Sequence, residues 1–261
     1  RVVFMYTDTE GIILKQLKIA GGRRMILLFS KKYGKISAGT DISEKGKKKS
    51  ALAIRPFVYG RYELYKKRDL YYLNGGDVIQ SHFAIGEDID KYIQASYAVE
   101  LTEKLLPEEA AAPELFLLLS DYLDMIEKRK QKYETLTLAY MAKTLKSAGS
   151  EPELNRCVLC GGKENLTAFS VKEGGCVCSA CRNGINSEER LIFEDSFGII
   201  DVLKYLTERP LAGLEKLALD ERMAGALERI LKSWLAYHLD VSDLKSETFL
   251  LQSDYMFENR G

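Results

Sequence analysis

Short apolar runs separated by turn residues fill the first third of the chain. Three runs, at residues 11–19, 24–30 and 35–39, are rich in β-branched or aromatic side chains and are separated by glycine-containing turns. Two more, at residues 55–66 and 70–73, follow a long basic loop and are closed by the turn residues Asn74, Gly75 and Gly76. Five strands in about 75 residues predict an OB-fold β-barrel. We expect this N-terminal domain to occupy residues 1–82.

From residue 87 onward the apolar spacing changes to that of helices. Five apolar residues recur every four positions: Ile89, Ile93, Tyr97, Leu101 and Leu105. This stripe predicts an amphipathic core helix that ends before Pro107. Further helices are predicted at residues 114–129, 133–148, 197–206, 214–219 and 222–239. The chain is therefore expected to be an α+β protein, with an all-α domain at residues 83–261.

The cysteines lie together within the helical part. All five fall between residues 157 and 181, and four form two Cys-x-x-Cys pairs seventeen residues apart: Cys157, Cys160, Cys178 and Cys181. This spacing is typical of a four-thiolate zinc site, because each pair folds into a knuckle that offers two sulfurs to one ion. Four thiolates fill the coordination sphere, so the zinc should be structural. The finger is expected at residues 155–183, inserted between helices.

Two other uses of these thiols fit the residues less well. Disulfides are seldom kept by a protein without an export signal, and a thioredoxin-like redox site needs one Cys-x-x-Cys rather than two. The fifth cysteine, Cys176, could replace Cys178 as a ligand. Cys178 is favoured because it keeps the two pairs symmetric.

The charges divide the chain into a basic and an acidic part. The net charge is zero, but residues 1–75 carry 17 Lys and Arg against 6 Asp and Glu, and the remainder carries 21 against 32. A basic segment with many aromatics predicts a nucleic-acid surface that follows phosphates and stacks on bases. The predicted phosphate contacts are Arg23, Arg24, Lys31, Lys32, Lys35, Lys47, Lys48, Lys49, Arg55, Lys66, Lys67 and Arg68.

Sequence motifs of catalysis are missing from the chain. It contains no phosphate-binding loop, dinucleotide fingerprint, zinc-protease helix or serine-hydrolase elbow, and its two histidines, His82 and His238, are expected to serve packing or capping. We therefore expect a binding protein rather than an enzyme. No apolar run approaches the roughly 18 residues that span a bilayer, and no segment has the pattern of a signal peptide. A cytoplasmic, nucleoid-associated protein is the expectation.

Several segments carry a resemblance to a known family. Residues 9–14, 26–30 and 33–38 look like its first three strands, and residues 152–161 and 174–181 look like its two cysteine knuckles. On these segments the chain resembles the RecO family of bacterial DNA repair proteins over nearly its whole length. In that family's pattern the second knuckle follows a glycine pair and two intervening residues, which supports Cys178. The chain departs from it at the acidic Asp41 and Glu44, which precede the basic loop.

The resemblance implies a recombination mediator of the RecF-type pathway. Such a protein binds single- and double-stranded DNA, anneals complementary strands, and acts with RecR and the single-strand-binding protein to load recombinase at gaps. The residues themselves leave other functions open. They also fit an RNA-binding zinc protein associated with translation or RNA metabolism, a zinc-dependent hydrolase with an open metal position, and an adaptor whose basic part binds an acidic protein.

Overall fold

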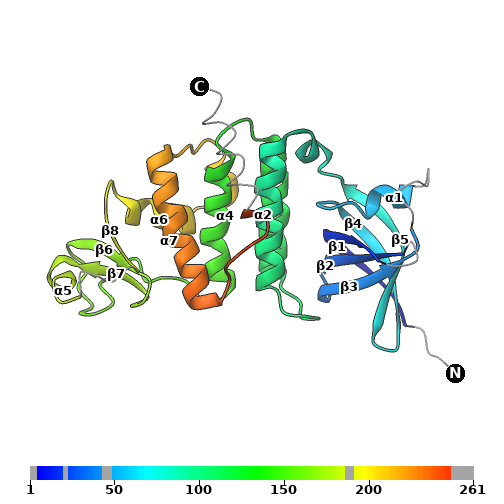
Figure 1. Cartoon of the computed structure of the whole chain (residues 1–261), viewed down its shortest axis with the longest axis horizontal. Helices are drawn as coiled ribbons and strands as arrows, with labels where there is room; N and C mark the ends of the chain where they lie inside the picture. Colours follow the sequence, from blue (N-terminus) through cyan, green and yellow to red (C-terminus); the bar gives the residue numbers. More distant parts are fainter. Residues whose placement is uncertain (1–4, 20–22, 43–48, 186–190, 248–261) are drawn as a thin grey trace. The chain divides into compact units, whose positions relative to one another are not determined.

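The chain forms two compact units (Figure 1), one of Arg1–Lys128 with Lys245–Gly261 and the other of Arg129–Leu244. The computed structural model describes residues 5–19, 23–42, 49–185 and 191–247, with the backbone alone at Met5, Lys49 and Ser50. The first unit holds a β-barrel with a short helix and two longer helices. The second holds further helices and a small sheet around the cysteines.

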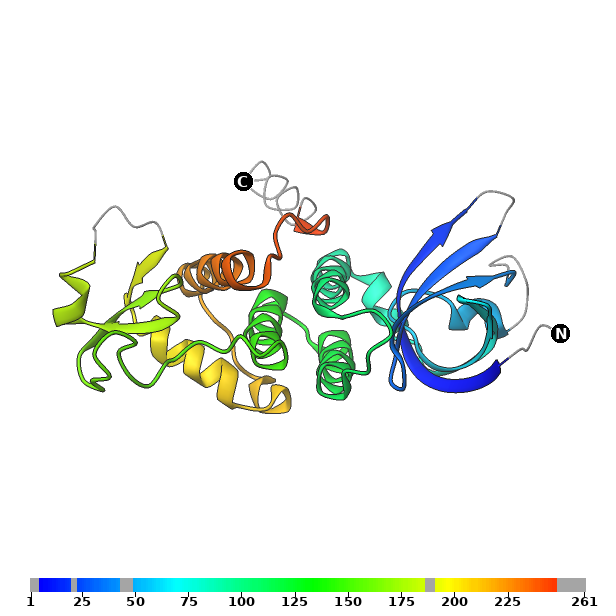
Figure 2. The same ribbon diagram turned by 90° about the horizontal axis from the view of Figure 1, so that it is seen from below.

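A closed barrel of five strands begins the first unit. Its strands are β1 (Met5–Lys18), β2 (Arg24–Ser30), β3 (Gly34–Thr40), β4 (Tyr59–Lys67) and β5 (Leu70–Gln80). They pair in the order β1-β2-β3-β5-β4, and β4 pairs with β1 to close the ring. Only β3 and β5 run parallel among these pairings, joined at Ala38 with Tyr71 and Gly39 with Tyr72. The strands curl around a shared interior (Figure 2), and the predicted OB-like barrel is confirmed.

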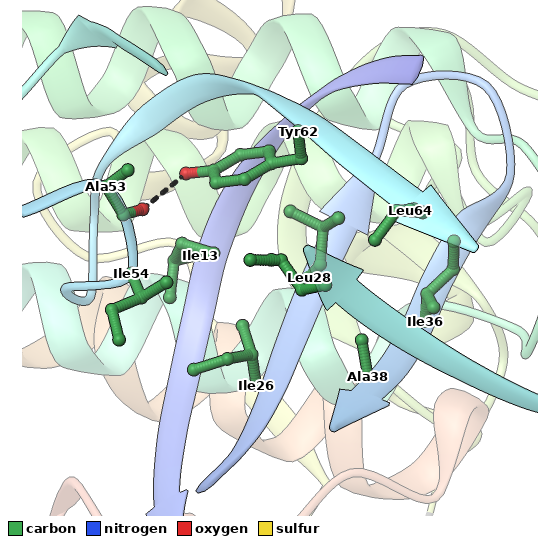
Figure 3. Packing of buried hydrophobic residues seen from close by; sticks show 10 residues of the cluster. Ile13, Ile26, Leu28, Ile36, Ala38, Ala53, Ile54, Tyr62 and Leu64 are labelled. Atoms are coloured by element: carbon green, nitrogen blue, oxygen red, sulfur yellow. Dashed lines mark hydrogen bonds between the residues drawn. The ribbon is translucent and has the colours of Figure 1, made fainter. Parts of the chain in front are cut away.

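Side chains from every strand fill the barrel interior. They are joined by residues of helix α1 (Lys49–Ala53) and the position after it, so that the cluster (Figure 3) comprises Ile13, Ile26, Leu28, Ile36, Ala38, Ala53, Ile54, Tyr62, Leu64 and Leu73. The Tyr62 ring is fully buried among them, and its hydroxyl donates a hydrogen bond to the Ala53 carbonyl at 2.7 Å. Burial raises the pKa of Tyr62 well above its usual range, so the hydroxyl stays a donor. This bond ties α1 to β4.

The turn predicted at residues 74–76 is wrong. β5 runs through these residues to Gln80 and pairs with β4 along both halves. A Cβ atom at Gly76 would lie 2.7 Å from Cδ1 of Tyr62, so the strand can pass the buried ring only with glycine there. Gly76 therefore serves close packing inside a strand, near a bulge between Glu63 and Leu64.

Two helices follow the barrel within the first unit. A 3₁₀ turn, η2 (Phe83–Glu87), leads into α2 (Ile89–Leu105), and α3 (Pro113–Lys128) comes next. The carboxylate of Asp88 caps α2 by accepting two backbone N–H bonds, at 3.0 and 3.1 Å. The predicted apolar stripe is buried at Ile93, Tyr97 and Leu101, whereas Ile89 in the first turn is 69% exposed.

Contacts on both helices hold the first unit together. Phe116 of α3 meets Phe29 of the barrel edge to face, with ring centroids 5.2 Å apart. Glu100 of α2 accepts bonds from the backbone N–H groups of Lys245 and Ser246, at 2.9 and 2.8 Å, and from the Ser246 hydroxyl at 2.7 Å. These bonds anchor the segment with which the chain returns from the second unit.

The second unit contains α4 (Tyr133–Ser147), α6 (Ile199–Glu208) and α7 (Glu221–Leu239), each within two residues of its predicted range. The helix predicted at residues 214–219 is wrong, because a 3₁₀ turn, η3 (Leu211–Leu214), ends where it should begin. The guanidinium of Arg129 donates bonds to the carbonyls of Leu214, Glu215 and Leu217, the acceptors that a helix would need. Among the residues described, no helix combines the length and apolar character needed to cross a membrane.

A three-stranded sheet carries the cysteine region of the second unit. Its strands β6 (Leu166–Ser170), β7 (Gly175–Cys178) and β8 (Ile192–Glu194) lie in the order β7-β6-β8, and the short helix α5 (Ser179–Arg182) follows β7. The Trp234 ring of α7 packs on Phe169 of β6 at 5.5 Å and donates Nε1–H to the Ser150 carbonyl at 2.8 Å. His238 bonds the Val171 carbonyl through Nε2 at 2.7 Å, which gives it the predicted packing role.

His82 joins the end of β5 to the helices of the first unit. Its ring is buried, and Nδ1 lies 3.3 Å from the carboxylate of Glu127, which also accepts bonds from Gln80 and the Ala84 N–H. The second ring nitrogen has no hydrogen-bond partner among the described residues, and Asp124 lies 3.8 Å from it. Burial lowers the pKa of His82 below 6.5, although Glu127 and Asp124 act in the opposite direction and Lys128 adds to the lowering.

Because the folded pKa of His82 is lowered, folding favours its neutral form. The free energy of unfolding should therefore fall as the pH drops below about 6.5, by at most about 1.4 kcal/mol per pH unit from this one proton. His82→Asn should flatten that slope, since asparagine tolerates the left-handed backbone found there (φ 49°). Urea unfolding between pH 8 and 5.5, with His238→Asn as the matched control, checks this; equal slopes for His82→Asn and the wild type would contradict it.

Candidate nucleic-acid interface and metal centre

The four sulfurs of the two Cys-x-x-Cys pairs gather at one end of the small sheet. They all lie within 4.8 Å of one another: Cys157, Cys160, Cys178 and Cys181. The first pair lies in a tight turn, in which the Cys157 N–H donates to the Gly162 carbonyl at 2.7 Å and the Gly161 N–H donates to the Cys157 carbonyl at 2.8 Å. The second pair spans the end of β7 and the start of α5. Residues far apart in sequence thus form one group that could hold a metal ion.

The spacing of the sulfurs matches a shared ion better than a disulfide. A tetrahedron with metal–sulfur bonds of about 2.3 Å has a sulfur–sulfur edge of about 3.8 Å. The Sγ atoms of Cys160 and Cys178 are 3.7 Å apart, and every cysteine is free of a disulfide. A disulfide would need about 2.05 Å between them.

The pKa values of two thiols in the group are shifted in opposite directions. Burial raises the pKa of Cys157, but the backbone N–H groups of Cys178, Cys160 and Leu159 outweigh it and lower the pKa to about 6. Hydrogen bonds with Cys160 and Cys178 raise the pKa of Cys181 to about 12. A cation bound among the sulfurs would offset the mutual repulsion of neighbouring thiolates.

Cys176 lies outside this group. Its side chain is fully buried, and its Sγ is 3.6 Å from the Leu154 carbonyl, to which it donates. Burial raises the pKa of Cys176 to about 12, so it remains a thiol. Of the two alternatives for the third ligand, the geometry thus supports Cys178.

The predicted phosphate contacts are in different surroundings on the barrel. Three form ion pairs with carboxylates: Lys31 with Glu10, Lys35 with Glu108 and Lys66 with Glu109, all at 3.1 Å. Arg23, Lys32, Arg55, Lys67 and Arg68 are exposed, and Arg24 is half-buried. Lys47 and Lys48 lie outside the described residues, as does the side chain of Lys49. The predicted cations therefore do not form one uniform surface.

A hollow on the barrel brings some of these cations together with aromatics. It has a volume of about 800 Å³ and lies over the parallel junction of β3 and β5. Arg23 and Arg24 line it from the start of β2, and Tyr65, Tyr71 and Tyr72 line it from the β4–β5 hairpin. Such a site can offer positive charge to phosphate and flat faces to bases.

Three tyrosines form a ladder across neighbouring strands beside this hollow. Tyr65 of β4 and Tyr72 of β5 are cross-strand partners. Their rings are stacked, with centroids 5.0 Å apart and an angle of 10° between the ring planes. Tyr6 of β1 is the partner of Tyr65 on the other side. Their ring centroids are 5.9 Å apart, and Tyr6 is 73% exposed. Other barrel aromatics, such as Phe29 and Tyr62, are buried in the core. Composition alone could not separate the two groups, because the distinction depends on strand register.

The fold and the site define a class of proteins in which an OB-like barrel precedes a helical body with an inserted four-cysteine finger. Residues 5–82 match the family model described as recombination protein O N terminal, and residues 86–248 match that of the C terminal. The chain therefore belongs to the RecO family of DNA repair proteins.

Curated relatives named DNA repair protein RecO are similar over most of the chain. That of Alkaliphilus metalliredigens is 30% identical over 239 residues, which cover 90% of this chain and 95% of the relative. That of a Thermoanaerobacter species is 28% identical over 242 residues, covering 93% and 96%. That of Oceanobacillus iheyensis is 33% identical over 177 residues, or 68% of each chain.

Replacing a cysteine of the group should have a different effect from replacing Cys176. Cys160→Ser removes one of four sulfurs, so bound metal should fall from about one ion per chain to nearly none. Cys176→Ala should keep the ion and cost only the loss of a few packing contacts. Elemental analysis of the purified variants by mass spectrometry checks both; loss of metal from Cys176→Ala alone would contradict this assignment of ligands.

Proposed function

We propose that this protein is a DNA-binding recombination mediator that anneals complementary strands. One observation carries the proposal: in a member of the RecO family, Arg23, Arg24 and the stacked Tyr65 and Tyr72 border the same hollow of an OB-like barrel. Arginine neutralises phosphate and the tyrosine faces receive unpaired bases, so the hollow suits a strand whose bases are exposed.

Further cations extend this surface in the proposal. The exposed Lys32, Arg55, Lys67 and Arg68 supply phosphate contacts around the barrel, together with Lys47, Lys48 and Lys49 of the basic loop. Phosphate contacts carry no sequence information, so single and double strands of any sequence are bound. The protein acts here by binding, without a catalytic site of its own.

The remaining parts have supporting roles in the proposal. The ion held by the four cysteines is zinc, and it is structural because the thiolates leave no position for a water. The helical part, in the acidic remainder of the chain, docks RecR and the single-strand-binding protein, so that recombinase is loaded at gaps. We place this activity in the cytoplasm, at the nucleoid.

Two substitutions in the hollow should weaken DNA binding in different ways. Arg23→Gln should lower affinity for an oligothymidine and make the slope of log K against log salt less negative by about 0.7, since it removes one phosphate contact. Tyr72→Leu should lower affinity about tenfold with the slope unchanged, because a base stack is worth about 1–3 kcal/mol. Fluorescence anisotropy over a salt series measures both, with Tyr237→Leu, an exposed tyrosine of α7, as control.

Wild-type affinity that ignores salt would contradict phosphate binding. With about five contacts to a single strand, the slope should be near −3.5. Competition by an RNA of the same length and base order distinguishes a protein of RNA metabolism, which would prefer the RNA.

Strand annealing should need no nucleotide. A cationic barrel lowers the repulsion between two strands held near one surface, so duplex should form faster with the protein than without it, and the acceleration should shrink as salt rises. Mixing complementary labelled strands and following energy transfer in the absence of ATP tests this. An absolute requirement for ATP, or a rate independent of the protein, would refute it.

A further inference from the structure

The connection between α2 and α3 lies along the barrel surface. We call residues 106–112 the α2–α3 strap. Its Glu108 forms a β-bridge with Lys35, and the Glu109 N–H donates to the Lys35 carbonyl at 3.2 Å. Gly34 contacts the strap so closely that a Cβ atom there would lie 1.9 Å from the Ala110 carbonyl oxygen. The backbone of the strap is therefore held against the start of β3.

The strap brings two carboxylates onto two barrel lysines. Glu108 pairs with Lys35, whose Nζ also donates to the Glu103 carbonyl at 3.1 Å and whose side chain is only 14% exposed. Glu109 pairs with Lys66 at 3.1 Å, and these two side chains are 52% and 29% exposed. In the first pair the lysine is thus enclosed although the Glu108 side chain is 69% exposed, whereas in the second pair both side chains are open to water and to salt.

The backbone of Glu109 is in an uncommon conformation. Its φ is 50°, in the left-handed region that residues other than glycine and asparagine seldom adopt. Such conformations persist where the surroundings hold them, and they concentrate at functional positions. In this chain the conformation accompanies the bonds that direct the Glu109 carboxylate to Lys66.

Tyr71 links this ion pair to the hollow. The Lys66 Nζ lies 4.5 Å from the centre of the Tyr71 ring, over its face, and 3.5 Å from its hydroxyl. Tyr71 also lines the hollow with Tyr65 and Tyr72. The Lys66 ammonium is therefore one side chain away from the site proposed for DNA, with its charge already engaged by a carboxylate.

We propose that Glu109 acts as an intramolecular competitor for phosphate at Lys66, and so sets the strength of DNA binding at the hollow. This proposal rests on DNA binding by the barrel. The carboxylate occupies the place that a phosphate oxygen would take, and a strand gains Lys66 as a contact only by displacing it. Because the pair is exposed, the exchange needs movement of two side chains and none of the strap backbone.

The test combines Glu109→Gln and Lys66→Gln with oligothymidine binding by the full chain. Glu109→Gln should raise affinity about threefold to tenfold at low salt and make the salt slope more negative by about 0.7, the effect of one added phosphate contact. Lys66→Gln alone should lower affinity slightly, because it leaves the Glu109 carboxylate unpaired near the strand, but it should leave the salt slope unchanged, since that lysine is already neutralised. The double variant should lose the gain and bind like the wild type.

Two further variants separate this effect from general electrostatics and from misfolding. Glu63→Gln removes an equal charge from β4, from a carboxylate that accepts a bond from Asn74, and should give a smaller gain that does not depend on Lys66. Glu109→Gly removes the carboxylate and suits the positive φ, so it should reproduce the gain of Glu109→Gln with the strap in place.

The outcomes also separate this proposal from DNA binding itself. If the wild type binds and Glu109→Gln binds equally well, competition at Lys66 is refuted while DNA binding stands. A gain that survives in the double variant refutes it too, since the gain would then owe nothing to Lys66. If neither the wild type nor Glu109→Gln binds in dilute buffer, both proposals fail.

Discussion

Closure of the barrel is the constraint on which the rest of the first unit depends. Four pairings are antiparallel and each joins seven to nine residue pairs, whereas β3 and β5 meet in parallel at only two residue pairs. Closure removes the exposed strand edges of an open sheet. The hollow lies beside this short junction and is lined from the start of β2, the end of β3 and the β4–β5 hairpin.

Charge on this barrel is distributed differently from charge along the chain. The excess of lysine and arginine in the first 75 residues is offset in part by carboxylates of the same unit. Glu108 and Glu109 come from beyond the barrel in sequence and lie on its lysines in space. The cationic surface thus depends on the basic residues of the strands and also on the positions at which the α2–α3 strap places acidic residues against them.

The sequence predicts what local patterns determine. Alternating apolar runs identify the barrel strands, and the symmetric cysteine pairs identify the four sulfurs that the structure gathers. It misjudges features that depend on distant contacts. Gly75 and Gly76 resemble a turn because nothing local shows that Gly76 must lie against the Tyr62 ring. The helix expected after Leu214 is absent because the Arg129 guanidinium binds the carbonyls of that segment. The tyrosine ladder likewise depends on register, which local pattern leaves open.

The chain has a single tryptophan, and its position has a practical consequence. Trp234 packs between Phe169 of the finger sheet and His238 of its own helix, entirely within the second unit. Its emission therefore reports the finger and α7, whereas the aromatic residues that line the hollow of the barrel are tyrosines. Selective excitation of the indole would follow changes in the finger without interference from ligand binding at the barrel.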